Sequence, residues 1–184
     1  YYHALKGHYM AAVELGRDAD AKRLKSRMES YRAGYNARYW TGTAYRSKYY
    51  RGATDDRVQA CAAVIGLAPK DYYPAIYKVL QTEFHASPYM ERYVFQALCE
   101  MGYGEWGIKR LKQRFGSIVD NKEFSTLPEY WSYEGKGTVN HAWSGGAVLP
   151  VANYIIGLRP LKPGYSRFCI DLHPCGVKEA SLNV

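Results

Sequence analysis

Apolar residues recur every three to four positions along most of this chain, which is the spacing that one buried face of a helix requires. The first stripe runs through Tyr2, Leu5, Tyr9 and Ala12. Comparable stripes occupy five further segments, which are residues 19–39, 55–65, 73–80, 89–101 and 106–115. A seventh helical segment, ending at Ile156, fits a start at either His141 or Ser144. The pattern predicts a mainly α-helical protein.

The ends of these segments carry consistent signals. Four of them stop at an apolar residue followed by glycine, and the pairs are Leu15-Gly16, Ile65-Gly66, Met101-Gly102 and Ile156-Gly157. Glycine adopts the left-handed conformation that closes a helix C-terminus. Ser87-Pro88 is a start signal, because a hydroxyl cap and a proline in the first turn favour a helix N-terminus. Short turns alternate with longer loops, which predicts stacked helical hairpins.

The pattern changes after Gly157, where two turn signals that contain proline follow each other. Residues 165–172 then alternate apolar and polar side chains, which predicts a half-buried strand. Its apolar positions are Phe168, Ile170 and Leu172. Residues 177–184 resemble the start of another strand. Two strands alone are marginally stable in water, and the chain begins in helical pattern without Met, so we expect a piece of a longer protein.

The net charge of +8 would permit a nucleic-acid partner. The basic residues of segment 19–39 alternate with acidic ones, however, as on a solvated helix face. The densest basic run, residues 109–114, lies on one helical segment. We therefore expect no nucleic-acid partner. No stretch approaches the apolar length of a membrane span, and we expect no membrane partner either.

Two of the four cysteines flank a histidine: Cys169 and Cys175 lie on either side of His173. This arrangement suggests a metal site, but its spacing matches none of the usual zinc patterns. Cys61 and Cys99 lie in apolar helical contexts and are expected to pack as small core residues. We expect neither a metal nor a cofactor.

Residues 125–146 carry most of the candidate chemistry. Glu129 precedes Tyr130 and Trp131, the glycine-rich turn 135–137 follows, and residues 140–146 read Asn-His-Ala-Trp-Ser-Gly-Gly, with His141 and Trp143 among them. A sugar presents hydroxyl groups to polar side chains and C–H faces to aromatic rings. A carboxylate, an imidazole and two indoles within one segment therefore suggest a sugar-processing pocket. Most of the 19 tyrosines are expected to pack in the core.

The ordered motifs of the chain resemble those of the bacterial α-L-rhamnosidases of glycoside hydrolase family 78. The matching segments cover nearly the whole chain: residues 55–57, 87–93, 125–131, 140–146 and 157–165. Any one of them alone is a weak signal. The order Thr-x-x-Glu-x-Trp, Asn-His-Ala-Trp-Ser-Gly and Gly-x-x-Pro-x-x-Pro-Gly is more specific. The resemblance implies an (α/α)6 toroid of helical hairpins followed by a β-sandwich, with the toroid's C-terminal half over residues 1–158 and the sandwich beginning within 159–184.

The resemblance also implies a mechanism. Enzymes of this family invert the anomeric centre with two carboxylates, a general acid and a general base, separated by room for a water molecule. The base falls on Glu129, and a histidine that contacts the sugar falls on His141. Trp131 and Trp143 are candidates for sugar stacking and, equally, for packing of the inner wall. The implied substrate is a rhamnose-containing glycoside or polysaccharide, and the implied location is periplasmic or extracellular.

Two departures from the family pattern qualify this interpretation. The residue before the base is usually aromatic, whereas here it is Pro128, which puts the sugar specificity in doubt. No segment matches the family's general acid, so we expect the acid to lie in a missing N-terminal half of the catalytic domain. Outside the motifs, Asp55 and Asp56 are expected to cap a helix and pair with Arg57. Glu91 is expected only to favour its helix start electrostatically.

Two alternatives to a rhamnosidase remain open at this point. A different sugar could bind the same six-hairpin fold, which Pro128 and the tyrosine-rich loop 45–50 would permit. The chain could instead be a non-catalytic carbohydrate-binding or interaction protein that has no acid. A panel of aryl glycosides separates the first alternative from a rhamnosidase, and the presence or absence of an acidic residue upstream separates the second.

Overall fold

A computed structural model describes residues 1–135, 137–173 and 175–183. Its helices are α1 (Tyr2–Glu14), α2 (Asp18–Tyr39), α3 (Asp56–Val64), α4 (Tyr73–Thr82), α5 (Glu91–Glu100) and α6 (Gly104–Val119). A continuous helical stretch follows a long loop and comprises the 3-10 turns η2 (Ala142–Ala147), the short α7 (Val148–Pro150) and the π-helical η3 (Val151–Ile156). The predicted helices are thus confirmed.

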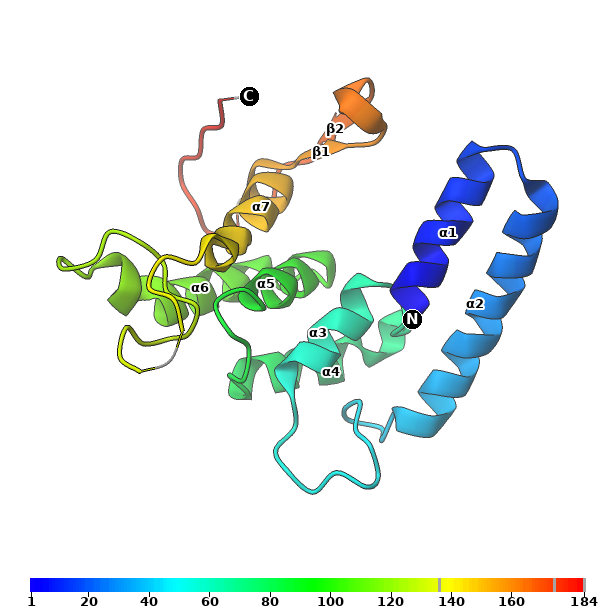
Figure 1. The fold of residues 1–184 in the computed structure, drawn as a ribbon, viewed down its shortest axis with the longest axis horizontal. Coiled ribbons are helices and arrows are strands. Elements are labelled where there is room, and N and C mark those ends of the chain that lie inside the picture. The colour runs from blue at the N-terminus through cyan, green and yellow to red at the C-terminus, as the bar shows by residue number, and fades with distance from the viewer. Residues whose placement is uncertain (136, 174, 184) are drawn as a thin grey trace.

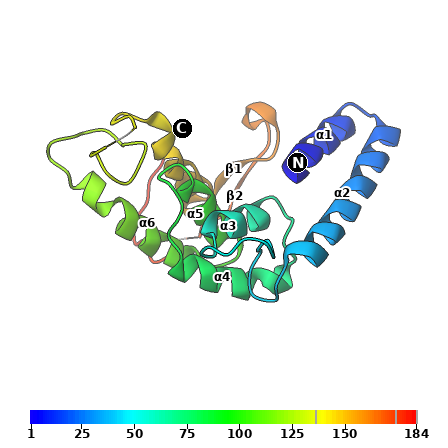
Figure 2. The same cartoon turned by 60° about the horizontal axis from the view of Figure 1, so that its bottom comes forward.

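The helices follow one another along an arc (Figures 1 and 2). The α1–α2 hairpin stands at one end of the arc, and α3 packs against both α4 and α5. Helix α5 in turn packs against α6, η2 and α7. Short connections alternate with three longer ones, which are residues 40–55, 83–90 and 120–141. Helical hairpins and a small C-terminal sheet, as expected from the sequence, are therefore confirmed.

The core lies where α3, α4 and α5 meet. Ile76 and Leu80 of α4 are fully buried, as are Val94 and Leu98 of α5. Helix α3 contributes small side chains, including Ala60, to this contact, and α3 and α5 are among the most closely packed helix pairs. Small residues at a helix interface permit the two backbones to approach each other. Helices α3, α4 and α5 therefore form the closely packed part of the protein from which the long loops extend.

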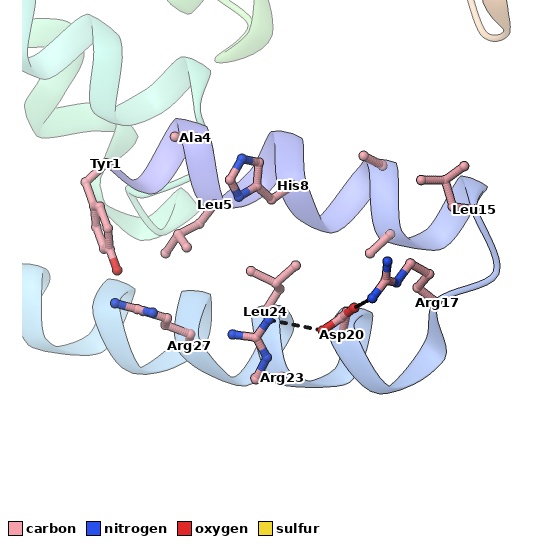
Figure 3. A pocket seen from close by; sticks show the side chains of 12 residues that line it. Tyr1, Ala4, Leu5, His8, Leu15, Arg17, Asp20, Arg23, Leu24 and Arg27 are labelled. Atoms are coloured by element: carbon pink, nitrogen blue, oxygen red, sulfur yellow. Dashed lines mark hydrogen bonds and ion pairs between the residues drawn. The ribbon is translucent and has the colours of Figure 1, made fainter.

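The α1–α2 hairpin has its own small core of Leu5, Ala12, Ala21 and Leu24. Between the two helices lies a groove of about 660 Å³, into which Leu5 and Leu24 project (Figure 3). Asp20 pairs with Arg17 and Arg23 at the rim of this groove. The hairpin is therefore held together by a thin apolar seam with exposed ion pairs beside it.

The predicted helix ends are largely correct. Gly16, Gly66, Gly102 and Gly157 have φ values between 65° and 88°, which is the left-handed conformation expected after a helix. The start predicted at Ser87-Pro88 is early, because α5 begins at Glu91. Residues 87–90 instead form a turn in which the Ser87 hydroxyl accepts a weak hydrogen bond from the Met90 amide, at 3.4 Å.

The C-terminal strands differ from expectation. The strand predicted over residues 165–172 is limited to β2 (Phe168–Ile170), and it pairs antiparallel with β1 (Leu158–Pro160). The predicted burial is wrong, since Phe168 and Ile170 are 52% and 66% exposed. Residues 177–183 contain no strand, while Val184 at the end of that predicted strand lies outside the described residues, as do Lys136 and Pro174. Proline in β1 had suggested a turn, but an edge strand tolerates proline.

Candidate active site

The loop between α6 and η2 folds back on itself, and this brings Glu129 and His141 together. The backbone amide of Glu129 donates to the Thr138 carbonyl at 2.9 Å, and the His141 amide donates to the Leu127 carbonyl at 2.7 Å. The Thr126 hydroxyl adds a bond to the Val139 carbonyl at 2.6 Å. Residues 126–129 are therefore paired with residues 138–141, as in a short hairpin.

Thr138 connects the two predicted site residues. Its backbone amide donates to Oε2 of Glu129 at 3.2 Å, and its hydroxyl forms a hydrogen bond with Nδ1 of His141 at 3.0 Å. A carboxylate and an imidazole that lie twelve positions apart in the sequence thus share one intermediate residue. Sequence reasoning missed Thr138, because its role depends on the fold of the loop and not on any motif.

The base of the loop is fixed by two further residues. Ser144 is fully buried and its hydroxyl donates to the Pro128 carbonyl at 2.7 Å. A Cβ on Gly137 would lie 2.7 Å from the Tyr130 ring and 3.3 Å from Oε2 of Glu129, at a φ of 118°. Only glycine fits this position without strain. Pro128, which departs from the family pattern, is itself buried, so the ring packs inside while its carbonyl keeps a partner.

The two predicted sugar-stacking tryptophans occupy different environments. Trp143 is 68% exposed and lies beside His141, with ring centroids 5.9 Å apart. Trp131 is partly buried, and its Nε1 donates to the Ala86 carbonyl at 2.7 Å. The Phe115 ring lies 5.0 Å from the Trp131 ring. Of the two, Trp143 presents a face that a sugar could reach, while Trp131 anchors the loop.

A buried cluster of four charged side chains lies next to the loop. Asp56, Glu91 and Arg110 are each at most 1% exposed, and Arg114 completes the set. The predicted role of Asp56 is wrong. The role predicted for Glu91 is incomplete, because Glu91 lies in the first turn of α5 as expected but also pairs with Arg110 and Arg114. Asp55 does cap α3 through the Arg57 amide and pairs with the Arg57 side chain, but Asp56 binds Arg110 at 2.5 Å.

The signal that could have identified this cluster is the position of Arg110 on α6. Gly107, Arg110 and Ile118 share one buried helix face. A charged residue on an apolar face needs a buried partner of opposite charge. The sequence contains the arginine and both carboxylates, but nothing in it shows which distant acid meets which base.

The described residues contain no group of three metal-binding side chains. His173 pairs with Asp171 at 3.0 Å, between the two cysteines that had suggested a metal. No helix in the described ranges is long and apolar enough to cross a bilayer.

Neither a protein-family model nor a curated protein sequence matches this chain. Solved structures do match. An α-L-rhamnosidase from Dictyoglumus thermophilum is similar over 95% of this chain, with a TM-score of 0.80 and 23% sequence identity. A rhamnosidase of glycoside hydrolase family 78 from Bacillus sp. GL1 is similar over the same share, with a TM-score of 0.75 and 20% identity. The chain spans 21% and 20% of the lengths of these two rhamnosidases and is similar to them in fold.

Proposed function

We propose that this chain supplies the general base of an inverting α-L-rhamnosidase, and that the base is Glu129. The observation that carries the proposal is the hydrogen-bonded series from Glu129 through Thr138 to His141. It lies on a long loop of a helical-hairpin fold that α-L-rhamnosidases share. A fold of this kind hosts many activities, so the site residues carry the argument for hydrolysis.

The role of each site residue follows from the chemistry of inversion. One carboxylate removes a proton from water on one face of the sugar while an acid protonates the leaving oxygen on the other, about 6.5–9.5 Å away. We assign Oε1 of Glu129 to the water, because Oε2 accepts the Thr138 amide. His141 then contacts the sugar hydroxyls, and Trp143 stacks on a C–H face of the ring.

The general acid is proposed to come from polypeptide other than these 184 residues, in an N-terminal half of the same catalytic domain. Asp56 and Glu91 are poor candidates, because both are buried and bound to Arg110. A general acid must reach the leaving oxygen and donate a proton to it, and a buried carboxylate held by an arginine does not reach a substrate. The substrate is proposed to be a terminal α-L-rhamnoside of a glycoside or polysaccharide, met in the periplasm or outside the cell.

The experiment that tests this function follows the first product of hydrolysis. The complete gene product that contains this chain is mixed with 4-nitrophenyl α-L-rhamnopyranoside and observed by proton NMR before the sugar mutarotates. Initial appearance of the β anomer supports inversion, and initial appearance of the α anomer contradicts it.

A parallel panel of aryl glycosides includes glucoside, galactoside and mannoside. Faster turnover of another sugar would favour a different six-hairpin glycosidase, and no turnover of any would favour a carbohydrate-binding protein.

A further inference from the structure

Arg110 is the centre of the buried charge cluster. Its guanidinium contacts Glu91 through Nε at 2.9 Å and Nη2 at 2.9 Å, and Asp56 through Nη2 at 2.5 Å. Its Nη1 donates to the carbonyls of Leu80 and Glu83 at 2.7 and 2.8 Å. Arg110 therefore ties α6 to the starts of α3 and α5 and to the end of α4. Arg110 thus contacts both carboxylates of the cluster. The fourth member of the cluster is Arg114.

Arg114 lies one turn further along α6, at the edge of the cluster. Its Nε contacts Oε1 of Glu91 at 3.2 Å. The cluster therefore contains two arginines and two carboxylates. Its Nη2 donates to the Ala86 carbonyl at 2.7 Å, and this is the same oxygen that accepts from Nε1 of Trp131. The centre of the guanidinium also lies 4.0 Å from the Trp131 ring. Arg114 thus contacts Trp131 both directly and through a shared acceptor.

The Trp131 indole is enclosed on more than one side. The Phe115 ring meets it edge-on at 5.0 Å, and the guanidinium of Arg114 also lies over Phe84, 5.6 Å from that ring. A planar guanidinium stacks on an aromatic face and donates in its own plane at the same time, which the ammonium of lysine cannot do. The position of the indole is therefore determined by α6 and by the 83–90 loop, both of which rest on the core.

Trp131 follows Glu129 by two residues, so whatever holds the indole limits where the carboxylate can lie. We propose that Arg114 is a positioning residue for Glu129 and acts through Trp131. The effect of Arg114 on catalysis rests on the proposed function. The effect of Arg114 on the position of the loop does not. Burial lowers the pKa of Arg114 from its ordinary value, with Glu91 acting in the opposite direction, and an arginine remains charged under such a shift.

The test uses the complete gene product with Arg114→Met and, as a second variant, Trp131→Phe. Trp131→Phe removes the Nε1 donor and leaves the charge cluster intact, so it remains informative if Arg114→Met does not fold. Lys109→Met is the matched control, because Lys109 is an exposed residue of the same helix, 4.9 Å from the Trp106 ring. Hydrogen exchange followed by mass spectrometry measures residues 126–141 and α5 separately, and kcat and KM are measured for each variant.

The proposal predicts faster exchange in residues 126–141 for both variants. Helix α5 should be unchanged in Trp131→Phe and less accelerated than the loop in Arg114→Met, which also loses the contact with Glu91 at the start of α5. It also predicts a kcat about 10²-fold lower at nearly constant KM, because a displaced catalytic group lowers turnover more than binding. The Lys109 variant should behave as the wild type. Unchanged exchange in residues 126–141 would overturn the proposal, and so would equal acceleration in α5, which indicates general loosening. Faster loop exchange with no change in kcat would contradict the positioning of Glu129 by Arg114, whereas the base role of Glu129 itself is tested separately by Glu129→Gln.

Discussion

Glu129 and Thr138 are joined by two hydrogen bonds that run in opposite directions. The Glu129 amide donates to the Thr138 carbonyl at 2.9 Å, and the Thr138 amide donates to the Glu129 carboxylate at 3.2 Å. The backbone bond sets the distance between the two halves of the folded-back loop, and the second bond orients the carboxylate. A carboxylate that is already oriented loses less conformational entropy when it binds a water molecule or a sugar.

The two tryptophans are predicted to respond differently to truncation. Trp143→Ala should raise KM about three- to tenfold and leave stability nearly unchanged, because its exposed ring has few packing contacts. Trp131→Ala should instead lower the free energy of unfolding by about 2 kcal/mol or more, because it removes a packed indole. Steady-state kinetics and urea denaturation of both variants check this prediction. Equal losses of stability would contradict the assignment of separate roles.

Removal of one carboxylate from the buried cluster is predicted to be costly. Glu91→Ala leaves Arg110 and Arg114 without the acid that both contact, and the free energy of unfolding should fall by about 3–5 kcal/mol. The comparison is Asp20→Ala, which removes a partly exposed acid from its pairs with the exposed Arg17 and Arg23 and should have little effect. Urea denaturation compares the two variants. A small loss of unfolding free energy for Glu91→Ala would contradict the prediction, because it would mean that water replaces the hydrogen bonds that Glu91 accepts from the two arginines.

Two glycines of α6 form a matched pair. A Cβ on Gly107 would lie 2.7 Å from the Phe95 ring, whereas a Cβ on Gly116 would meet nothing within 4 Å. Gly107→Ala should therefore destabilise the protein by about 1–3 kcal/mol through overpacking. Gly116→Ala should stabilise it by about 0.5–1 kcal/mol, because alanine favours the helix. Thermal denaturation measures the change in stability of each variant, which should be opposite in sign. Stabilisation by Gly107→Ala would contradict the close packing of α6 against α5.

Asp55 is predicted to make stability depend on pH. Its hydrogen bonds from the Arg57 side chain are the main cause that holds its pKa below the ordinary value of 3.8. A lowered folded-state pKa adds stability above about pH 4, and this stability is lost as the pH falls through the folded value. Asp55→Ala should cost about 1 kcal/mol at pH 7 as a lost helix cap. The difference between variant and wild type should shrink below pH 4, and a constant difference would contradict the link to ionisation.

Much of the helical architecture was predictable because burial repeats with the helical period. The stripe through Ile76 and Leu80 and the glycines that close four of the helical segments are local signals that need no tertiary information. The sheet was harder, because β1 contains a proline and its pairing partner lies ten residues on. Short exposed strands carry little alternation, and tertiary pairing decides them.

The candidate site was predictable only in its parts. Glu129 and His141 stand in motifs, and both are found on the folded-back loop. Thr138 and Arg114 could not be found in this way, because their partners are set by the path of the loop. The buried charge pairs of Asp56 and Glu91 were missed for the same reason, since Arg110 lies 54 and 19 positions away from them. Pairing of charges across such distances is a property of the fold.

The most direct measurement of the central claim is the turnover of α-L-rhamnoside by Glu129→Gln in the complete gene product. Glutamine keeps the size of the side chain and removes the base. The account predicts a loss of kcat of about 10²–10⁴-fold with an unchanged unfolding midpoint. The isolated 184-residue chain, without the proposed acid, is predicted to release no rhamnose. A Glu129→Gln variant that retains most of its kcat would contradict the account.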